Sequence, residues 1–268
     1  MTVDTLGAVT IGESDIACGG SVLRIRFSSR TDVGSVRKAN EDSVLTQAPV
    51  FFVADGMGGH ARGDAASQTV VRVFEEHIEP GAASTPERIL DAIHSSNDAV
   101  RDLSTAGDIG TAISGTTLAG VAFVDAGADE GCQWMVFNVG DSRVYSWSGD
   151  RLRQVTVDHS AVQEMVDAGL LDPERAENHP ERNVITRAIG ADEYVDADVW
   201  LLPPGEHPAF LICSDGLVKE LDDDQIARVL AAHGADDESS AADALVEAAL
   251  HNGGHDNVSV VVVRAMLS

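Results

Sequence analysis

Four aspartates stand next to apolar, strand-like segments, and their carboxylates are the groups of this chain best suited to chemistry. Asp55 ends the run FFVAD, Asp141 follows VFNVG, and Asp215 follows FLICS. Asp256 precedes Asn257 and the apolar run that closes the chain. A strand end holds a carboxylate stiffly, and several converging carboxylates would repel one another unless a cation neutralised them. Oxygen-rich sites of this kind select hard cations, Mg²⁺ or Mn²⁺, and also admit Ca²⁺.

Each of these aspartates taken alone has a simpler interpretation as a turn residue, because Asp-Gly is a common turn signal. The context that all four share favours a joint role as metal ligands. They are spread over the chain and are not grouped in a 12-residue loop, which excludes a calcium-buffering protein of the helix–loop–helix type.

The overall charge limits the possible partners. The chain has 268 residues with 18 Lys and Arg against 44 Asp and Glu, a formal net charge of −26. Such an excess repels nucleic acid and anionic lipid, so we expect neither as a partner. An anionic substrate would need local positive charge, which bound metal ions could supply.

The three cysteines, Cys18, Cys132 and Cys213, are an odd number, lie far apart and form no CxxC motif. This spacing predicts neither a zinc site nor a disulfide framework. Cys213 lies in an apolar run, and we expect it in the core. The start of the chain does not resemble a signal peptide, and no stretch reaches the ~18 apolar residues of a membrane span. We therefore expect a soluble, cytoplasmic protein from a reducing compartment, without a membrane segment.

Hydrophobic patterning predicts the elements that must position the aspartates. Strands are expected at 22–29, 43–48, 50–55, 115–125, 132–141, 142–148, 151–156, 195–202, 209–215 and 256–267. Helices are expected at 62–78, from Pro86 to about Val100, and at 161–171, 223–233 and 241–253. Strand residues 134, 135, 137 and 139 are expected to be core, and the run Asp222–Asp224 to begin a helix.

Strands and helices do not alternate strictly, which argues against a doubly wound parallel sheet. The order favours the α+β class, with antiparallel sheets covered by helices. We expect one domain over residues 21–268, preceded by a flexible N-terminal extension at 1–20. The polar segment 158–190 is expected to leave the core as an excursion.

The chain resembles the metal-dependent protein serine/threonine phosphatases, the protein phosphatase 2C family, in their bacterial form. The resemblance runs from about Arg24 to Val263. It rests on ordered segments that together are very specific: TDVGSVRKANEDS, FFVADGMGGHARGDAAS, SGTTL, NVGDSRVY, DHS at 158–160, HPERNVITRAIG, LICSDGL and GGHDNVSVVVV. It implies a β-sandwich of two antiparallel sheets flanked by helix pairs, with a flap subdomain at about 158–190.

The resemblance also implies a ligand set for two Mn²⁺ or Mg²⁺ ions. Asp55 would bridge both ions and Gly56 would offer its carbonyl oxygen. Asp215 and Asp256 would complete the first ion. The ligands of the second ion would be Glu41, largely through water, and Asp42 behind it. A third, weaker ion is implied at Asp141 together with Asp215.

The implied reaction is hydrolysis of phosphoserine and phosphothreonine on proteins by a water molecule shared between the two metals. Arg37 would bind the substrate phosphate. No phospho-enzyme is required, so no cysteine should act as a nucleophile. The general acid stays open between His60 and a metal-bound water, because Met57 stands where some relatives have a histidine.

The flap residues Ser160, His179 and Arg187 are expected to border substrate access, although each also has an interpretation as local flap packing. The expected partners are phosphorylated proteins and a bacterial Ser/Thr kinase system. A catalytically dead member used as a phospho-dependent binding module is the alternative. Such a member typically loses a metal aspartate or the phosphate arginine, and this chain retains them all.

Overall fold

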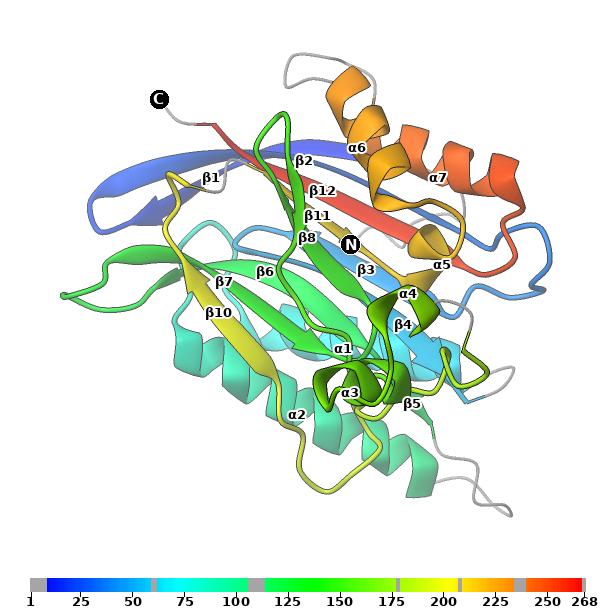
Figure 1. Ribbon diagram of the computed structural model, residues 1–268. Helices are drawn as coiled ribbons and strands as arrows, with labels where there is room; N and C mark the ends of the chain where they lie inside the picture. The colour runs from blue at the N-terminus through cyan, green and yellow to red at the C-terminus, as the bar shows by residue number, and fades with distance from the viewer. Residues whose placement is uncertain are drawn as a thin grey trace.

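The protein is described from a computed structural model, which covers residues 9–58, 62–105, 114–176, 179–206, 209–233 and 240–266. Two antiparallel sheets face each other, and helices cover their outer sides (Figure 1). The expected α+β sandwich is confirmed.

The first sheet has the strand order β1-β2-β12-β11-β8-β9. Its strands are β1 (Thr10–Cys18), β2 (Ser21–Asp32), β8 (Arg143–Trp147), β9 (Leu152–Gln154), β11 (Ala209–Cys213) and β12 (Val258–Met266). The second sheet has the order β10-β7-β6-β4-β3, with β5 paired to β4. Its strands are β3 (Asp42–Gln47), β4 (Val50–Met57), β5 (Gly115–Thr116), β6 (Leu118–Asp125), β7 (Cys132–Val139) and β10 (Asp198–Leu202).

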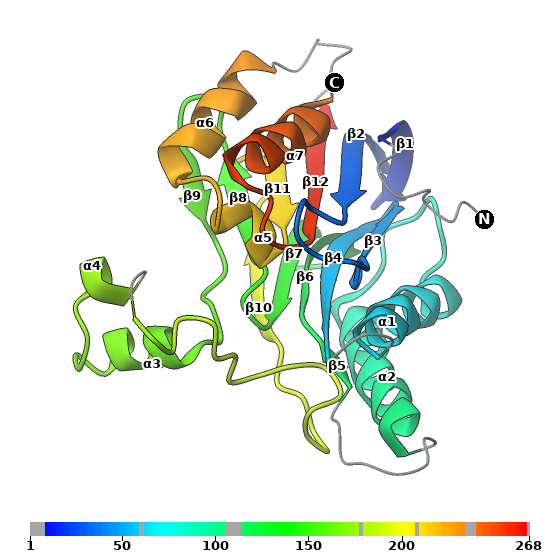
Figure 2. The ribbon, with the colours of Figure 1, turned by 90° about the vertical axis from the view of Figure 1, so that its right-hand side faces the viewer.

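The helices described are α1 (Gly63–His77), α2 (Pro86–Thr105), α3 (Ala161–Asp167), α4 (Pro173–Ala176), α5 (Asp215–Val218), α6 (Asp223–Ala232) and α7 (Ala241–Asn252). The four longest of these form one layer on each outer face. Figure 2 shows α1 and α2 on one side of the sandwich and α6 and α7 on the other. This is the pair of helical layers expected from the sequence.

The central strands are buried on both faces, which explains why they read as continuous apolar runs. In β4, Phe51 and Val53 point into the layer between the sheets, whereas Phe52 and Ala54 pack under α1 and α2. Trp134 fills the layer between the sheets, with ring centroids 5.2 Å from Phe123 and 5.3 Å from Phe210. The expected core residues of β7 are fully buried: Trp134, Met135, Phe137 and Val139.

The N-terminal region differs from the sequence expectation. A flexible extension over 1–20 is wrong for Thr10–Cys18, which forms β1 and pairs along its length with β2. The hydrophobic pattern of this segment is weak because β1 is an edge strand with many exposed residues. Residues 1–8 lie outside the described residues.

The cysteine prediction is also wrong. Cys18, at the end of β1, forms a disulfide with Cys132, at the start of β7. The bond joins the two sheets across a sequence separation of 114 residues, which local spacing rules do not detect. Disulfides are rare in reducing compartments, so this pair does not fit the expectation of reduced thiols. Cys213 is unpaired and buried as expected, and burial raises the pKa of its thiol to about 12.

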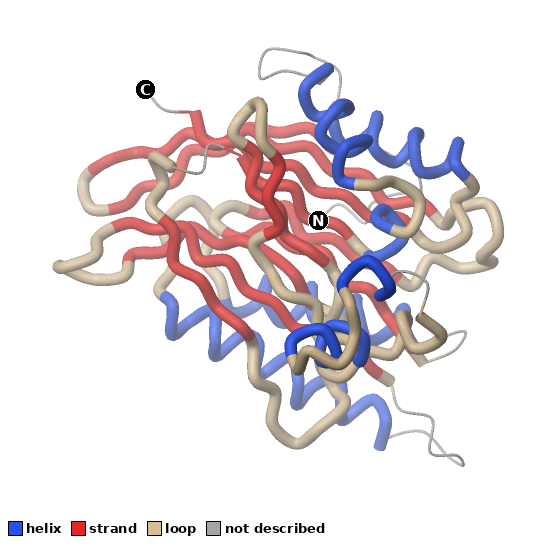
Figure 3. Tube along the Cα trace, viewed as in Figure 1, coloured by secondary structure: helices blue, strands red, loops and turns tan. Residues whose placement is uncertain are grey.

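The segment 158–190 leaves the sandwich as a flap that carries α3 and α4. An isolated bridge between Ser160 and Ile185 closes its base. Figure 2 shows α3 and α4 away from the sheets, and Figure 3 shows that loops make up much of the connection to β10.

The acidic run before α6 begins a helix as predicted. Asp222 caps α6 by accepting a hydrogen bond from the Gln225 backbone N–H at 2.7 Å, and the Gln225 side chain accepts from the Asp222 backbone at 2.9 Å. In the part of the chain that the structure describes, no helix is both long enough and apolar enough to cross a membrane.

Candidate metal centre

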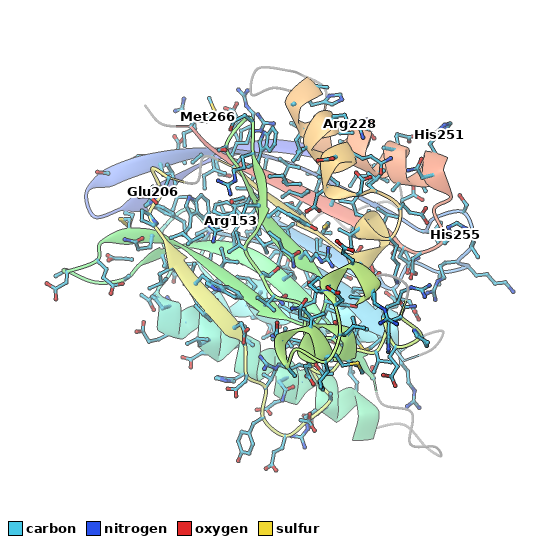
Figure 4. All side chains as sticks on the ribbon, viewed as in Figure 1. Arg153, Glu206, Arg228, His251, His255 and Met266 are labelled. Atoms are coloured by element: carbon cyan, nitrogen blue, oxygen red, sulfur yellow. A yellow bond between two sulfur atoms is a disulfide. The ribbon has the colours of Figure 1, made fainter. Side chains whose placement is uncertain are left out.

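The predicted aspartates meet at one end of the sandwich, although they come from four separate segments. Asp55 lies in β4, Asp141 between β7 and β8, Asp215 at the start of α5, and Asp256 just before β12. Burial raises the pKa of Asp55 well above its usual range, and the nearby charges of Asp42, Asp215, Asp141 and Asp256 raise it further. Figure 1 shows α5 and the end of β4 on the same side of the molecule, and Figure 4 places His255, the neighbour of Asp256, there too.

The backbone around Gly56 is packed too closely for any side chain. A Cβ at this position would lie 2.2 Å from the Gly63 carbonyl oxygen, at the start of α1, and 2.5 Å from that of Glu41. The Gly56 N–H donates to the Glu41 carbonyl at 3.1 Å. Glycine is therefore needed to bring β4, α1 and the segment before β3 together beside Asp55.

Asn257 holds the segment that carries Arg37 and Glu41 against the strand β12. Its side-chain oxygen accepts from the Glu41 N–H at 2.9 Å. Its amide donates to the carbonyls of Val33 at 2.9 Å and Ala39 at 3.0 Å. The sequence places Asn257 next to Asp256 but indicates no role for its side chain.

Gly216 allows α5 to approach the same asparagine, because a Cβ there would lie 1.9 Å from the Asn257 carbonyl oxygen. The backbone of α5, and with it Asp215, is therefore fixed against the residue that follows Asp256.

Several carboxylate oxygens at this end are buried and, within the described ranges, have no hydrogen-bond partner. They are Glu41 Oε1, both side-chain oxygens of Asp42, Asp141 Oδ1 and Asp215 Oδ1. Buried polar atoms are normally hydrogen-bonded, so such a set needs an explanation. Oxygen ligands for Mg²⁺ or Mn²⁺ provide it, and the residues present fit these ions.

Burial raises the pKa of Asp42 to about 7, against the nearby hydroxyls of Ser259 and Ser214, which lower it. Neither hydroxyl forms a well-oriented hydrogen bond to the carboxylate. Burial also raises the pKa of Asp141 to about 7, with a further contribution from Asp215. Buried carboxylates that favour protonation in this way are expected where a cation normally neutralises them.

Two basic side chains, Arg37 and Lys219, contact the carboxylates of Asp256 and Asp215. Arg37 contacts Asp256 in a bidentate manner, with Nε 2.8 Å from Oδ1 and Nη2 2.9 Å from Oδ2. The Lys219 ammonium contacts Asp215 and lies 3.0 Å from Asp256 Oδ2. Among the described residues, no three His, Cys, Asp or Glu side chains converge closely enough to enclose an ion in this arrangement.

These contacts favour the ionised form of the Asp256 carboxyl group. Burial acts to raise its pKa, but Lys219, the Asn257 N–H and Arg37 outweigh that effect, so the pKa of Asp256 lies below its usual range.

The flap residues divide into local and connecting groups. The Ser160 side chain caps α3 by accepting from the Gln163 N–H at 3.3 Å, and His179 Nδ1 accepts from the Glu181 N–H at 3.2 Å. Both are turn or cap contacts within the flap. Arg187 instead connects the flap to the sandwich, because its Nη1 lies 2.8 Å from Asp198 Oδ1 and donates to the Asp196 carbonyl.

His159, within the segment DHS, connects the flap to the sandwich although its sequence context predicts no such role. Its Nδ1 accepts from the Gly140 N–H at 3.0 Å, next to Asp141, and its Nε2 lies 3.3 Å from Asp198 Oδ2. The Thr186 N–H donates to its carbonyl at 2.9 Å. His159 thus joins the Asp141 turn to the flap base.

Lys219 was also missed, although its position four residues after Asp215 on a helical turn was a usable signal. His60, one of the two candidates for the general acid, lies outside the described residues.

Known proteins resemble this chain over most of its length. The sequence pattern of the family described as Protein phosphatase 2C matches residues 37–250. The serine/threonine protein phosphatase PstP of Mycobacterium tuberculosis is 35% identical over 90% of this chain, which spans only 45% of that relative's length. The serine/threonine phosphatase stp of Listeria innocua is 33% identical over 89% of this chain and 95% of its own.

A solved structure agrees in fold as well. The catalytic domain of PstP in complex with two manganese ions superimposes with a TM-score of 0.75 at 32% identity, covering 91% of this chain and all of that one. The match in sequence pattern and in fold leads to one conclusion: this chain belongs to the protein phosphatase 2C family.

Proposed function

We propose that this chain hydrolyses phosphoserine and phosphothreonine on proteins with the help of Mn²⁺ or Mg²⁺. The observation that carries the proposal is the convergence of buried carboxylates with unpartnered oxygens beside an exposed arginine, Arg37. The phosphatase names of the relatives and the manganese ions of the PstP structure support it.

The proposed ligands are those expected from the family resemblance. Asp55, the Gly56 carbonyl, Asp215 and Asp256 would hold one ion. Asp55, Glu41 and Asp42 would hold the second, and Asp141 with Asp215 would hold a third. When bound, divalent ions supply a nucleophilic water at neutral pH and neutralise phosphate charge.

Arg37 is proposed to bind the substrate phosphate. Its side chain is 52% exposed, so its guanidinium is accessible, and its contact with Asp256 holds it beside the metal ligands. A guanidinium matches two phosphate oxygens at once, which would orient the ester for in-line attack. The flap residues Ser160, His179 and Arg187 are proposed to border the path of the substrate.

The proposed setting is bacterial, with substrates phosphorylated by a Ser/Thr kinase system in the cytoplasm. The net charge of −26 would repel such anionic substrates. Metal ions and Arg37 provide positive charge at the site, and salt screens more distant charges beyond about 8 Å.

Hydrolysis of a phosphothreonine peptide by the purified chain tests the proposal. We expect activity with added Mn²⁺ that EDTA abolishes and that Asp55→Asn removes. Activity that survives EDTA would contradict metal dependence. A chain that binds the phosphopeptide with Mn²⁺ present but never cleaves it would be a binding module.

A further inference from the structure

Lys219 lies within the proposed metal site and not on the surrounding surface. Its ammonium contacts the Asp215 carboxylate four residues earlier and lies 3.0 Å from Asp256 Oδ2. Its charge also acts to lower the pKa of Asp141. The chain has only two lysines, Lys38 and Lys219, against sixteen arginines, so this contact is not the chance result of an abundant residue.

The contact is stronger than an ordinary surface ion pair. The side chains of Asp215 and Asp256 are only 16% and 18% exposed, so they are poorly screened by solvent. Asp256 also has Arg37 as a partner, whereas Asp215 has Lys219 on one oxygen and nothing among the described residues on the other. Lys219 is thus the main cation that neutralises Asp215.

The Lys219 side chain can turn away from Asp215 and Asp256 without disturbing the backbone. The backbone N–H of Lys219 donates to the backbone carbonyl of Asp215 at 2.9 Å, which fixes the backbone at the end of α5. Its side chain is 34% exposed and has a flexible four-carbon stem, so the ammonium can turn toward solvent.

We propose that Lys219 is an internal cation that competes with the divalent metal for Asp215 and Asp256, and so sets the metal concentration at which the site fills. The inference rests on the proposed function, because it needs these two aspartates to be metal ligands. The ammonium contacts Asp256 Oδ2 and one oxygen of Asp215, while Asp215 Oδ1 stays open. A divalent ion that binds these carboxylates must take oxygens from the ammonium or lie beside its positive charge. Part of the binding free energy is therefore used to displace Lys219.

The competition has two consequences, and only their combination distinguishes it from a purely structural ion pair. Replacement by a neutral side chain should tighten metal binding, because there is no longer a competitor to displace. The same replacement should destabilise the metal-free protein, because Asp215 loses its main counter-charge. A structural ion pair would produce the second effect without the first.

The test is titration of the EDTA-stripped, dialysed protein with Mn²⁺ by isothermal calorimetry. For Lys219→Gln we expect the dissociation constant of the tightest ion to fall about 5- to 10-fold, within the usual range of coupling between two sites. Lys219→Arg keeps the charge and should stay near wild type. Lys38→Gln removes the same charge from an exposed position and should leave binding unchanged. Circular dichroism with saturating Mn²⁺ checks that each variant folds.

A spectroscopic measurement follows the lysine directly. Protein labelled with [¹³C]lysine should give two Cε–Hε signals, which Lys38→Arg assigns. Saturation with diamagnetic Mg²⁺ should shift the signal of Lys219 and leave that of Lys38 in place. An unmoved Lys219 signal at saturation, or equal or weaker Mn²⁺ binding by Lys219→Gln, overturns the inference. If the wild-type chain binds no metal at millimolar concentration, both the inference and the proposed function fail. If it binds and the variant does not differ, only the inference fails.

Discussion

Asp42 of β3 lies directly opposite Asp55 of β4 in the antiparallel ladder. Like charges in this position repel, and burial keeps water from screening them. Burial raises both pKa values, and the charge of Asp42 raises that of Asp55 further. A pair of strands that placed two carboxylates face to face with no cation would lose stability, so the pairing itself argues for a metal.

Removal of one of these charges should reveal the repulsion. We expect Asp55→Asn to raise the stability of the metal-free protein by on the order of 1 kcal/mol, or about 2–4 °C in Tm. The variant should also lose the rise in Tm that Mn²⁺ gives the wild type. Differential scanning calorimetry with EDTA and with Mn²⁺ measures both effects. The control is Asp150→Asn, in the exposed turn between β8 and β9. It should leave both the Tm of the metal-free protein and the rise in Tm with Mn²⁺ unchanged. A lower Tm for metal-free Asp55→Asn would contradict the repulsion.

Loss of the Arg37 guanidinium should weaken phosphate binding. Charge-assisted hydrogen bonds are worth about 1.5–3 kcal/mol, so Arg37→Ala should lower kcat/KM for a phosphothreonine peptide by about 10- to 150-fold, mainly through KM. Steady-state kinetics at saturating Mn²⁺ separates this effect from any change in metal affinity. Arg153→Ala serves as control, because Arg153 is exposed on β9, away from His255 in Figure 4. An unaltered KM for Arg37→Ala would count against its role.

The His159 link should make stability depend on pH. Burial lowers the pKa of His159 below its ordinary value of 6.5; Arg187 lowers it further, while Asp198 and Asp158 oppose this. The Gly140 N–H donates to Nδ1, so the neutral ring carries its proton on Nε2, facing Asp198. Protonation of Nδ1 would break the Gly140 hydrogen bond.

The direction of the pH dependence follows from the difference between the folded and unfolded pKa values of His159. Because the folded pKa lies below the unfolded one, the contribution of His159 is complete above pH 6.5 and is lost as the pH falls through the folded value. We expect the difference in Tm between wild type and His159→Asn to shrink between pH 7 and 5, since Asn keeps an acceptor for Gly140 but does not titrate. A Tm difference that grows toward acid pH would contradict a lowered pKa of His159 in the folded protein.

The disulfide should stabilise the sandwich without affecting the chemistry. Cys132 begins β7 and Asp141 follows the other end of that strand, so the bond lies roughly 25 Å from the site at the usual rise per residue. The double variant Cys18→Ser/Cys132→Ser should lose about 2–4 kcal/mol of stability and keep its kcat. Alkylation and mass spectrometry of the unfolded, unreduced protein should find one thiol, that of Cys213. Three thiols in protein alkylated inside intact cells would show that the bond does not form there.

The sequence by itself determined the elements and the candidate residues. Alternating and continuous apolar runs specify local structure, so β4, β12, α1 and α7 were predicted close to their observed bounds, and Asp222 was recognised at the start of α6. The aspartates were identifiable because each stands next to an apolar strand in the sequence, a relation that involves only adjacent residues.

The tertiary structure alone decided which groups neutralise and hold those aspartates. Lys219 meets Asp256 across 37 residues, Arg37 meets it across 219, and Cys18 meets Cys132 across 114. β1 is recognisable as a strand only by its pairing with β2, because an exposed edge has no continuous apolar pattern. Periodicity records the face of an element that is buried, whereas contacts between distant segments depend on strand order and register.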